Sequence, residues 1–199
     1  MEGVKPYPTR YILILLITAA SLPALLLPAS LDTIHQEFGI SRENLLDGKY
    51  WTPFTFSLFH RSFAHYLFNI VLITWMSKQI ETAYGSTKMA GLVLLSVITS
   101  STAVIVSSDF SSVIGASGIV FGMLGVYSAW AVLYPNDLSK RYKISMGVIL
   151  LVNLFVHWLI FRNGLAISIS AHVGGFVGGV LFGVLDRLPA RRRRRSTYN

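Results

Sequence analysis

Residues 113–122 read VIGASGIVFG, a run of small residues that opens a long apolar segment and carries one hydroxyl group, that of Ser117. Two interpretations of this serine are open. Ser117 could only allow neighbouring helices to approach closely, as small residues do in membrane proteins. It could also be a nucleophile on a tight turn at a helix start, where backbone N–H groups point at the group under attack. The choice depends on whether another segment supplies a base at the same depth.

The composition of the chain is typical of a polytopic membrane protein. Of its 199 residues, 53% are hydrophobic and 13% are charged, and the mean hydropathy is +0.57. Six runs without Lys, Arg, Asp or Glu have about the length that crosses a ~30 Å hydrocarbon layer, which takes ~20 residues. The predicted fold class is therefore an all-α membrane protein, a six-transmembrane-helix bundle with a long outer loop between helices 1 and 2.

The expected organisation is one compact membrane domain over residues 1–190 and a basic cytoplasmic tail at 191–199. The first apolar run is too long and too late in the chain for a cleaved signal peptide. Within the outer loop, Ser41 is predicted to cap a short helix with Glu43 in its first turn. The expected helices lie at about 11–31, 60–78, 88–108, 115–135, 144–161 and 166–186.

The basic residues predict that both termini lie in the cytoplasm. In that orientation 13 of the 17 Lys and Arg residues fall inside, as the positive-inside rule requires. The arginine run from Arg191 to Arg195 follows the last apolar segment directly. It indicates a topology anchor or a contact with anionic lipids, and we expect no nucleic-acid partner. The four basic residues that fall outside are Arg42, Lys49, Arg61 and Arg162.

Cofactor and metal chemistry has little support in the sequence. The chain contains no cysteine, which excludes disulfides, thiol nucleophiles and cysteine-ligated metals. His60 and His65 are five residues apart with no carboxylate between them, and no His-Glu-x-x-His motif occurs. We therefore expect neither a metal nor a cofactor.

Among the polar side chains of the apolar segments, those of two segments are the main candidates for a site. His65 and Asn69 are four residues apart and share a helix face, where they could make interhelical contacts or line a cavity. In the last segment, His172 continues a stripe of glycines that would bring a neighbouring helix close. The small-residue stripe that contains Gly118 and Gly122 is the expected packing partner of this glycine stripe. The glycines of the last segment are Gly175, Gly179 and Gly183.

These polar groups are expected at similar depths. Counted from the cytoplasmic ends at 1.5 Å per residue, Ser117, His65 and His172 lie at about 26, 20 and 21 Å. A serine, a histidine and a His/Asn pair are the parts of a serine hydrolase. Ser117 would be the nucleophile and a neutral His172 its base. No acidic residue lies in the runs, so the site would be a Ser/His dyad.

These segments resemble the signature of the rhomboid family of intramembrane serine proteases, in the family's order and spacing from about residue 51 to 183. The resemblance is carried by Gly115-Ala116-Ser117-Gly118 with Phe121-Gly122, by His60-x4-His65-x3-Asn69, and by Ala171-His172-x2-Gly175-x3-Gly179. Glu81 with Gly85-Ser86 also fits.

The resemblance implies a role for each matched residue. Ser117 and His172 would form the catalytic dyad, His65 and Asn69 would assist at the oxyanion, and His60 would support them. Gly115 and Gly118 would allow the turn and the close approach of substrate, whereas Gly122 and the glycines after His172 would pack the helices. Phe121 stands where some members have Tyr, and its aromatic face could still orient His172. Two positions differ from the family pattern. Many members have Arg directly after the Trp, where this chain has Thr52, and Arg two residues after the Glu, where it has Ala83.

The function implied by the resemblance is cleavage of the transmembrane segments of other membrane proteins, through an acyl-enzyme. Its partners would be those transmembrane substrates and the lipid bilayer. The expected location is a prokaryotic plasma membrane, with the active site opening to the outer side. One alternative is a catalytically inactive relative that binds membrane helices. Another is a small transporter or proton relay, which would need ionisable groups across the whole bilayer.

Overall fold

The computed structural model describes residues 8–27, 31–107, 112–136, 140–162 and 168–186 of the chain. Over these residues the chain is almost entirely helical, and its β structure is one isolated antiparallel bridge between Ile40 and Val113. The helical fold class predicted from the composition is thus confirmed, while the expected basic tail at 191–199 lies outside the described residues.

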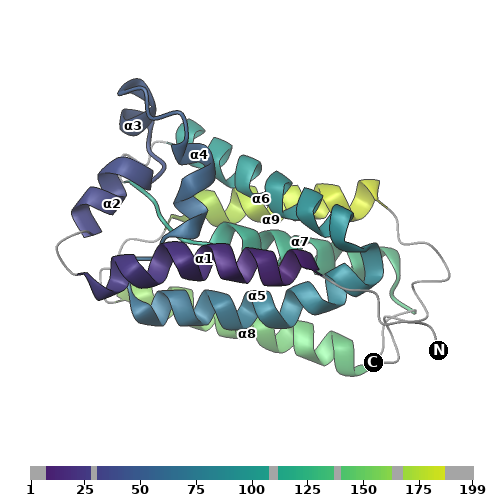
Figure 1. The fold of residues 1–199 in the computed structure, drawn as a ribbon. Coiled ribbons are helices and arrows are strands. Elements are labelled where there is room, and N and C mark those ends of the chain that lie inside the picture. Colours follow the sequence, from purple (N-terminus) through teal and green to yellow (C-terminus); the bar gives the residue numbers. More distant parts are fainter. Residues whose placement is uncertain (1–7, 28–30, 108–111, 137–139, 163–167, 187–199) are drawn as a thin grey trace.

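Six long helices form the body of the molecule and run side by side in Figure 1. Each of them overlaps one of the helices expected from the sequence. The boundary that matters most for the site is the start of α5, because α5 begins at Phe63 and leaves His60 in the turn before it. The long helices are α1 (Pro8–Leu26), α5 (Phe63–Tyr84), α6 (Ser86–Val106), α7 (Ser117–Leu133), α8 (Lys140–Arg162) and α9 (Ile169–Leu185).

The segment between α1 and α5 contains short helices that gather at one end of the bundle in Figure 1. Ser41 caps α3 as predicted, because its hydroxyl oxygen accepts the backbone N–H of Asn44 at 3.0 Å and Glu43 follows in the first turn. This segment is therefore an ordered cap on the bundle. Its elements are α2 (Leu31–Phe38), α3 (Arg42–Leu46), α4 (Thr52–Thr55) and the 3₁₀ turn η2 (Phe56–Leu58).

Two of the described helices, α1 and α6, are long and apolar enough by themselves to cross a membrane. Their most apolar windows have mean hydropathies of 1.8 and 2.1. Shorter apolar helical stretches occur at Ser117–Leu133, Lys143–Asn153 and Ile169–Leu185. The number of six spans therefore stays a prediction.

The centre of the bundle is a contact between the backbones of α7 and α9. A Cβ atom added at Gly179 would lie 1.8 Å from the carbonyl oxygen of Gly122, and one added at Gly175 would lie 2.1 Å from that of Gly118. Both distances are far inside van der Waals contact, so any larger residue would force the helices apart. The pairing of the two glycine stripes expected from the sequence is confirmed.

Helix α6 packs its serines into the same contact. A Cβ atom at Gly122 would lie 1.9 Å from the hydroxyl oxygen of Ser96, and one at Gly118 would lie 2.4 Å from that of Ser100. Ser96 and Ser100 are both fully buried. Small residues on three helices thus allow α6, α7 and α9 to approach one another closely.

The buried carboxylate of Glu81, near the end of α5, binds the start of α1. Its two oxygens accept the backbone N–H groups of Thr9 at 2.9 Å and Arg10 at 3.3 Å. The first N–H groups of a helix have no partner within the helix, and the helix dipole favours an anion there. The hydroxyl of Thr9 also donates to the carbonyl of Ser86 at 3.0 Å. The start of α1 is therefore tied to the turn that joins α5 to α6.

Replacement of Gly179 by Ala should destabilise the bundle by about 1–3 kcal/mol, the usual cost of extra atoms in a tightly packed interior. The measurement is unfolding by denaturing detergent in mixed micelles. Gly91→Ala on α6 is the matched control, since a Cβ there meets nothing within 4 Å. Equal stability of the two variants would contradict the close contact between α7 and α9.

Candidate active site

The side chains of Ser117 and His172 are in direct contact. Ser117 is the first residue of α7 and His172 lies in the first turn of α9, which Ser168 caps by accepting the backbone N–H of Ala171. The Nε2 atom of His172 lies 2.7 Å from the Oγ atom of Ser117. This distance is at the short end of the normal range for a hydrogen bond. The geometry is that of a hydroxyl nucleophile with an adjacent base.

Phe121 restrains the ring of His172. Phe121 lies one turn after Ser117 on α7, and the two rings stack with their centroids 4.4 Å apart and their planes inclined by 9°. His172 is 8% exposed. The sequence-based expectation that an aromatic face orients this histidine is confirmed.

The turn before Ser117 depends on Gly115. Its backbone has φ +142°, a conformation that side chains with a Cβ rarely adopt. A Cβ atom there would also lie 2.7 Å from the Cε1 atom of His65. The N–H of Gly115 donates to the carbonyl of Phe56 at 2.9 Å. The glycine thus permits the turn and admits the His65 ring beside it.

His60 is fully buried and joins α1 to this turn. Its Nδ1 atom lies 2.9 Å from the Oγ atom of Ser21, and its Nε2 atom accepts the backbone N–H of Ala116 at 3.3 Å. Ser21 donates its single hydroxyl proton to the carbonyl of Leu58 at 2.8 Å. The hydroxyl of Ser21 must then accept from Nδ1–H of His60, which assigns the proton to Nδ1 and leaves Nε2 as the acceptor.

Ser21 is a site residue that sequence reasoning missed. It is one hydroxyl in the long apolar run of α1, with no motif around it, and it is fully buried. Only the packing of α1 against the turn before α5 reveals its contact with His60. Through His60, this contact also fixes the hydrogen bond of the Ala116 N–H, one residue before Ser117.

His65 and Asn69 lie on α5 beside the turn. Ser62 caps this helix by accepting the backbone N–H of His65 at 3.2 Å. The ring of His65 meets that of His60 edge to face, with centroids 5.0 Å apart. Asn69 is 1% exposed and donates one amide hydrogen to the carbonyl of His65 at 2.9 Å. An asparagine amide has two such hydrogens, so this bond uses one of them.

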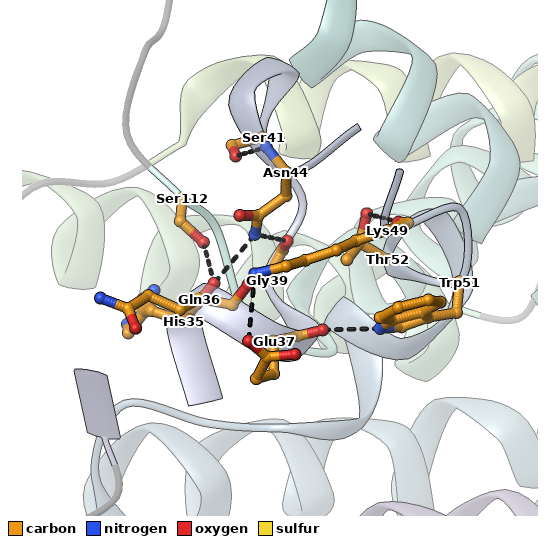
Figure 2. Close-up of polar contacts among 10 residues, drawn as sticks. All are labelled: His35, Gln36, Glu37, Gly39, Ser41, Asn44, Lys49, Trp51, Thr52 and Ser112. Carbon is orange, nitrogen blue, oxygen red and sulfur yellow. Dashed lines mark hydrogen bonds and ion pairs between the residues drawn. The ribbon is translucent and has the colours of Figure 1, made fainter. Parts of the chain in front are cut away.

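The segment that leads into the turn is held by the cap of short helices between α1 and α5, as Figure 2 shows. The carbonyl of His35 accepts the hydroxyl of Ser112 at 2.8 Å and the amide of Asn44 at 3.1 Å. Directly after Ser112, Ile40 and Val113 exchange two backbone hydrogen bonds of 3.0 Å. The end of α2 therefore fixes the chain a few residues before Ser117, through side chains that no motif had marked.

Trp51 and Lys49 bind the end of α2 and stabilise the cap (Figure 2). The indole N–H of Trp51 donates to the carbonyl of Glu37 at 2.6 Å. Lys49 donates to the carbonyl of Gln36 at 2.7 Å and to the carboxylate of Glu37 at 3.1 Å. Thr52, at the position where the family pattern often has Arg, is fully buried and donates to the carbonyl of Lys49 at 2.9 Å. The cap is thus anchored without that arginine.

In the part of the chain that the structure describes, no group of three or more His, Cys, Asp or Glu residues is placed to hold a metal ion. The candidate site itself consists of a hydroxyl, imidazoles, an amide and backbone groups.

Comparison with known proteins gives the family. Residues 47–188 match the model described as the Rhomboid domain. The chain is 29% identical over 153 residues to Rhomboid protease GluP of Bacillus subtilis (strain 168), which covers 76% of this chain and 29% of that protein. It is 31% identical over 148 residues to YdcA, another rhomboid relative in the same organism, which covers 74% of this chain and 72% of that protein. The chain thus spans less than a third of GluP. Since the Rhomboid domain occupies more than half of the sequence, this chain belongs to the rhomboid family of integral membrane proteins.

Proposed function

We propose that this protein is an intramembrane serine endopeptidase that cleaves the transmembrane segments of other membrane proteins. The observation that carries the proposal is the 2.7 Å approach of His172 Nε2 to Ser117 Oγ. The name of the relative GluP, a rhomboid protease, supports it.

In the proposed acylation step, neutral His172 takes the proton of Ser117 as Oγ attacks the carbonyl carbon of the scissile peptide bond. The tetrahedral intermediate collapses, the C–N bond breaks, and His172 gives the proton to the leaving amine. The product is an ester on Ser117. Water then attacks this ester while His172 accepts its proton, and the return of that proton to Oγ releases the acid and regenerates the hydroxyl.

The negative oxygen of each intermediate needs donors that are already in place. The N–H of Ser117 is suited to this, because it belongs to the first residue of α7 and has no partner within the helix. The ring of His65 and the second amide hydrogen of Asn69 are the further candidates. The N–H of Ala116 is not a candidate donor, because it already donates to the ring of His60.

The dyad would work without the acid of a Ser-His-Asp triad. In a triad, the carboxylate holds the histidine in its orientation. Here we assign that function to the stack of His172 on Phe121 and to the close packing of α9 on α7.

The proposed topology has six spans, with both termini in the cytoplasm and the site opening to the outer side of a prokaryotic plasma membrane. The six long helices contain 17 to 23 residues each, which is within or at the edge of the range for a membrane span. The distribution of basic residues supports the orientation. Because a helical peptide bond is shielded, a substrate helix must unwind before Ser117 can attack it, and water must reach the site.

The direct test uses purified protein with a labelled transmembrane substrate. Ser117→Ala and His172→Ala should each abolish cleavage, because each removes one half of the dyad. Ser128→Ala, lower on α7, is the control and should retain activity. Labelling by a fluorophosphonate that disappears in Ser117→Ala would separate an enzyme from an inactive helix-binding relative. Undiminished cleavage by either dyad variant contradicts the proposal.

Replacement of Asn69 by Ala should lower kcat by about 10²–10³-fold with little change in KM, the usual effect of losing one oxyanion donor. Asn153→Ala on α8 is the matched control. Asn153 is equally buried and donates to the carbonyl four residues earlier at 2.9 Å, as Asn69 does. If both variants lose the same activity, Asn69 acts only through the structure of its helix.

Replacement of Ser21 by Ala should lower kcat about 10-fold, because a buried N–H of His60 loses its acceptor at a cost of about 1–3 kcal/mol and the turn at Ala116 loosens. Thr18→Ala one turn earlier on α1 is the control, since Thr18 bonds the hydroxyl of Tyr66 on α5 at 2.9 Å and its removal leaves Ser21 as the partner of His60. Both variants should lose similar thermal stability. An equal loss of kcat in both would show that Ser21 has no special effect on the site.

A further inference from the structure

A cavity of about 690 Å³ lies between α7, α8 and α9, away from the α5 side of the site. Its walls are mainly apolar. It reaches from the dyad histidine to the far end of α7 and is lined among others by Phe121, Ala131, Lys143, Gly147, His172 and Phe176. Nothing in the proposed reaction uses its lower part.

The two ends of this cavity differ chemically. His172 lies at the end near Ser117. Lys143 lies at the opposite end, where its ammonium donates to the carbonyl of Pro135, just beyond α7, at 2.5 Å. An ammonium group has three hydrogens, so Lys143 can donate to a further oxygen. The cavity is thus an open apolar groove with a cation at one end.

The dimensions of the cavity indicate what can occupy it. From Phe121 to Ala131 it extends about 15 Å along α7 at 1.5 Å per residue. Its volume of about 690 Å³ over that length leaves room for extended hydrocarbon chains. A polymethylene chain fits, because carbon atoms pack at about 4 Å from one another.

We propose that this cavity binds an anionic phospholipid of the bilayer, with an acyl chain between α7, α8 and α9 and the phosphate at Lys143. An apolar void in a membrane protein forfeits the dispersion contacts of its walls, and an acyl chain restores them. The chain itself gains little by leaving the surrounding lipid, which is as apolar as the cavity. The ammonium of Lys143 therefore supplies the selectivity, and it favours anionic over zwitterionic headgroups. This inference requires only that the protein is embedded in a membrane, and it does not depend on the dyad.

The test is photolabelling of the full-length protein in phosphatidylcholine bilayers that contain a few per cent of phosphatidylglycerol with a diazirine on one acyl chain. Mass spectrometry of the peptides should find adducts on the cavity-lining residues of α7 and α8. These should exceed the adducts on Leu15 and Leu16, which are exposed on α1 and report general contact with lipid. The same diazirine on a phosphatidylcholine should label the cavity about 5-fold less, the fold-change that corresponds to one basic residue at an anionic lipid.

Two variants test separately how the headgroup and the acyl chain contribute to binding. Lys143→Gln should reduce phosphatidylglycerol labelling of the cavity about 5-fold, whereas Lys78→Gln on the exposed face of α5 should not. Gly147→Leu should strongly reduce the cavity adducts, because the leucine side chain would project into the space where the acyl chain lies. Gly91→Leu is its control, since a Cβ at either glycine meets nothing within 4 Å and both replacements favour the helix.

Equal cavity labelling by the two lipids, or labelling that persists undiminished in Gly147→Leu, overturns the proposal. Displacement of the lipid by a transmembrane peptide that itself labels these residues in place of the lipid would also overturn it. Because the readout is an adduct and not cleavage, failure of this inference is distinct from failure of the proposed protease activity.

Discussion

The structure depends on the direct contact between the backbones of α7 and α9. Gly122 and Gly179 approach so closely that a single methyl group would not fit between them. In a membrane no hydrophobic force drives helices together, so such packing supplies much of the attraction. Next to the Gly118–Gly175 contact, the same arrangement brings Ser117 and His172 within hydrogen-bond distance. Packing and site geometry are thus one feature of the molecule, since the glycines set the distance between the two side chains.

The second requirement is a rigid turn in front of Ser117. Three separate parts of the chain hold it: the carbonyl of Phe56 bonds Gly115, the ring of His60 bonds Ala116, and the end of α2 bonds Ser112. Each uses a backbone or buried polar group that would otherwise be left unsatisfied, which is costly in an apolar environment. The polar groups around Ser117 therefore stabilise the fold and position this serine through the same bonds.

Much of this arrangement could be predicted because its signals are local. Uncharged runs located the long helices, Ser41 marked the cap of α3, and the four-residue glycine spacing marked which faces of α7 and α9 pack. The contacts of Ser21, Ser112 and Asn44 could not be predicted. Those of Ser21 and Ser112 join residues far apart in the chain, 39 positions for Ser21 and His60 and 77 for Ser112 and His35. A single polar residue such as Asn44 carries no pattern that names its partner. His60 was also expected on the second helix, but the helix begins at Phe63, after the N-cap Ser62.

The sequence by itself determined the class of the protein, its expected helices and the residue types of a serine hydrolase, because composition, hydropathy and spacing are properties of the chain alone. Only the tertiary structure decided that Phe121 stacks on His172, that His60 occupies the N–H of Ala116, and that Trp51 and Thr52 anchor the outer cap without an arginine. The cavity that ends at Lys143 was likewise invisible in the sequence. The physical reason is that ring stacking, the direction of a hydrogen bond and the shape of a void depend on how helices from distant segments are placed in three dimensions.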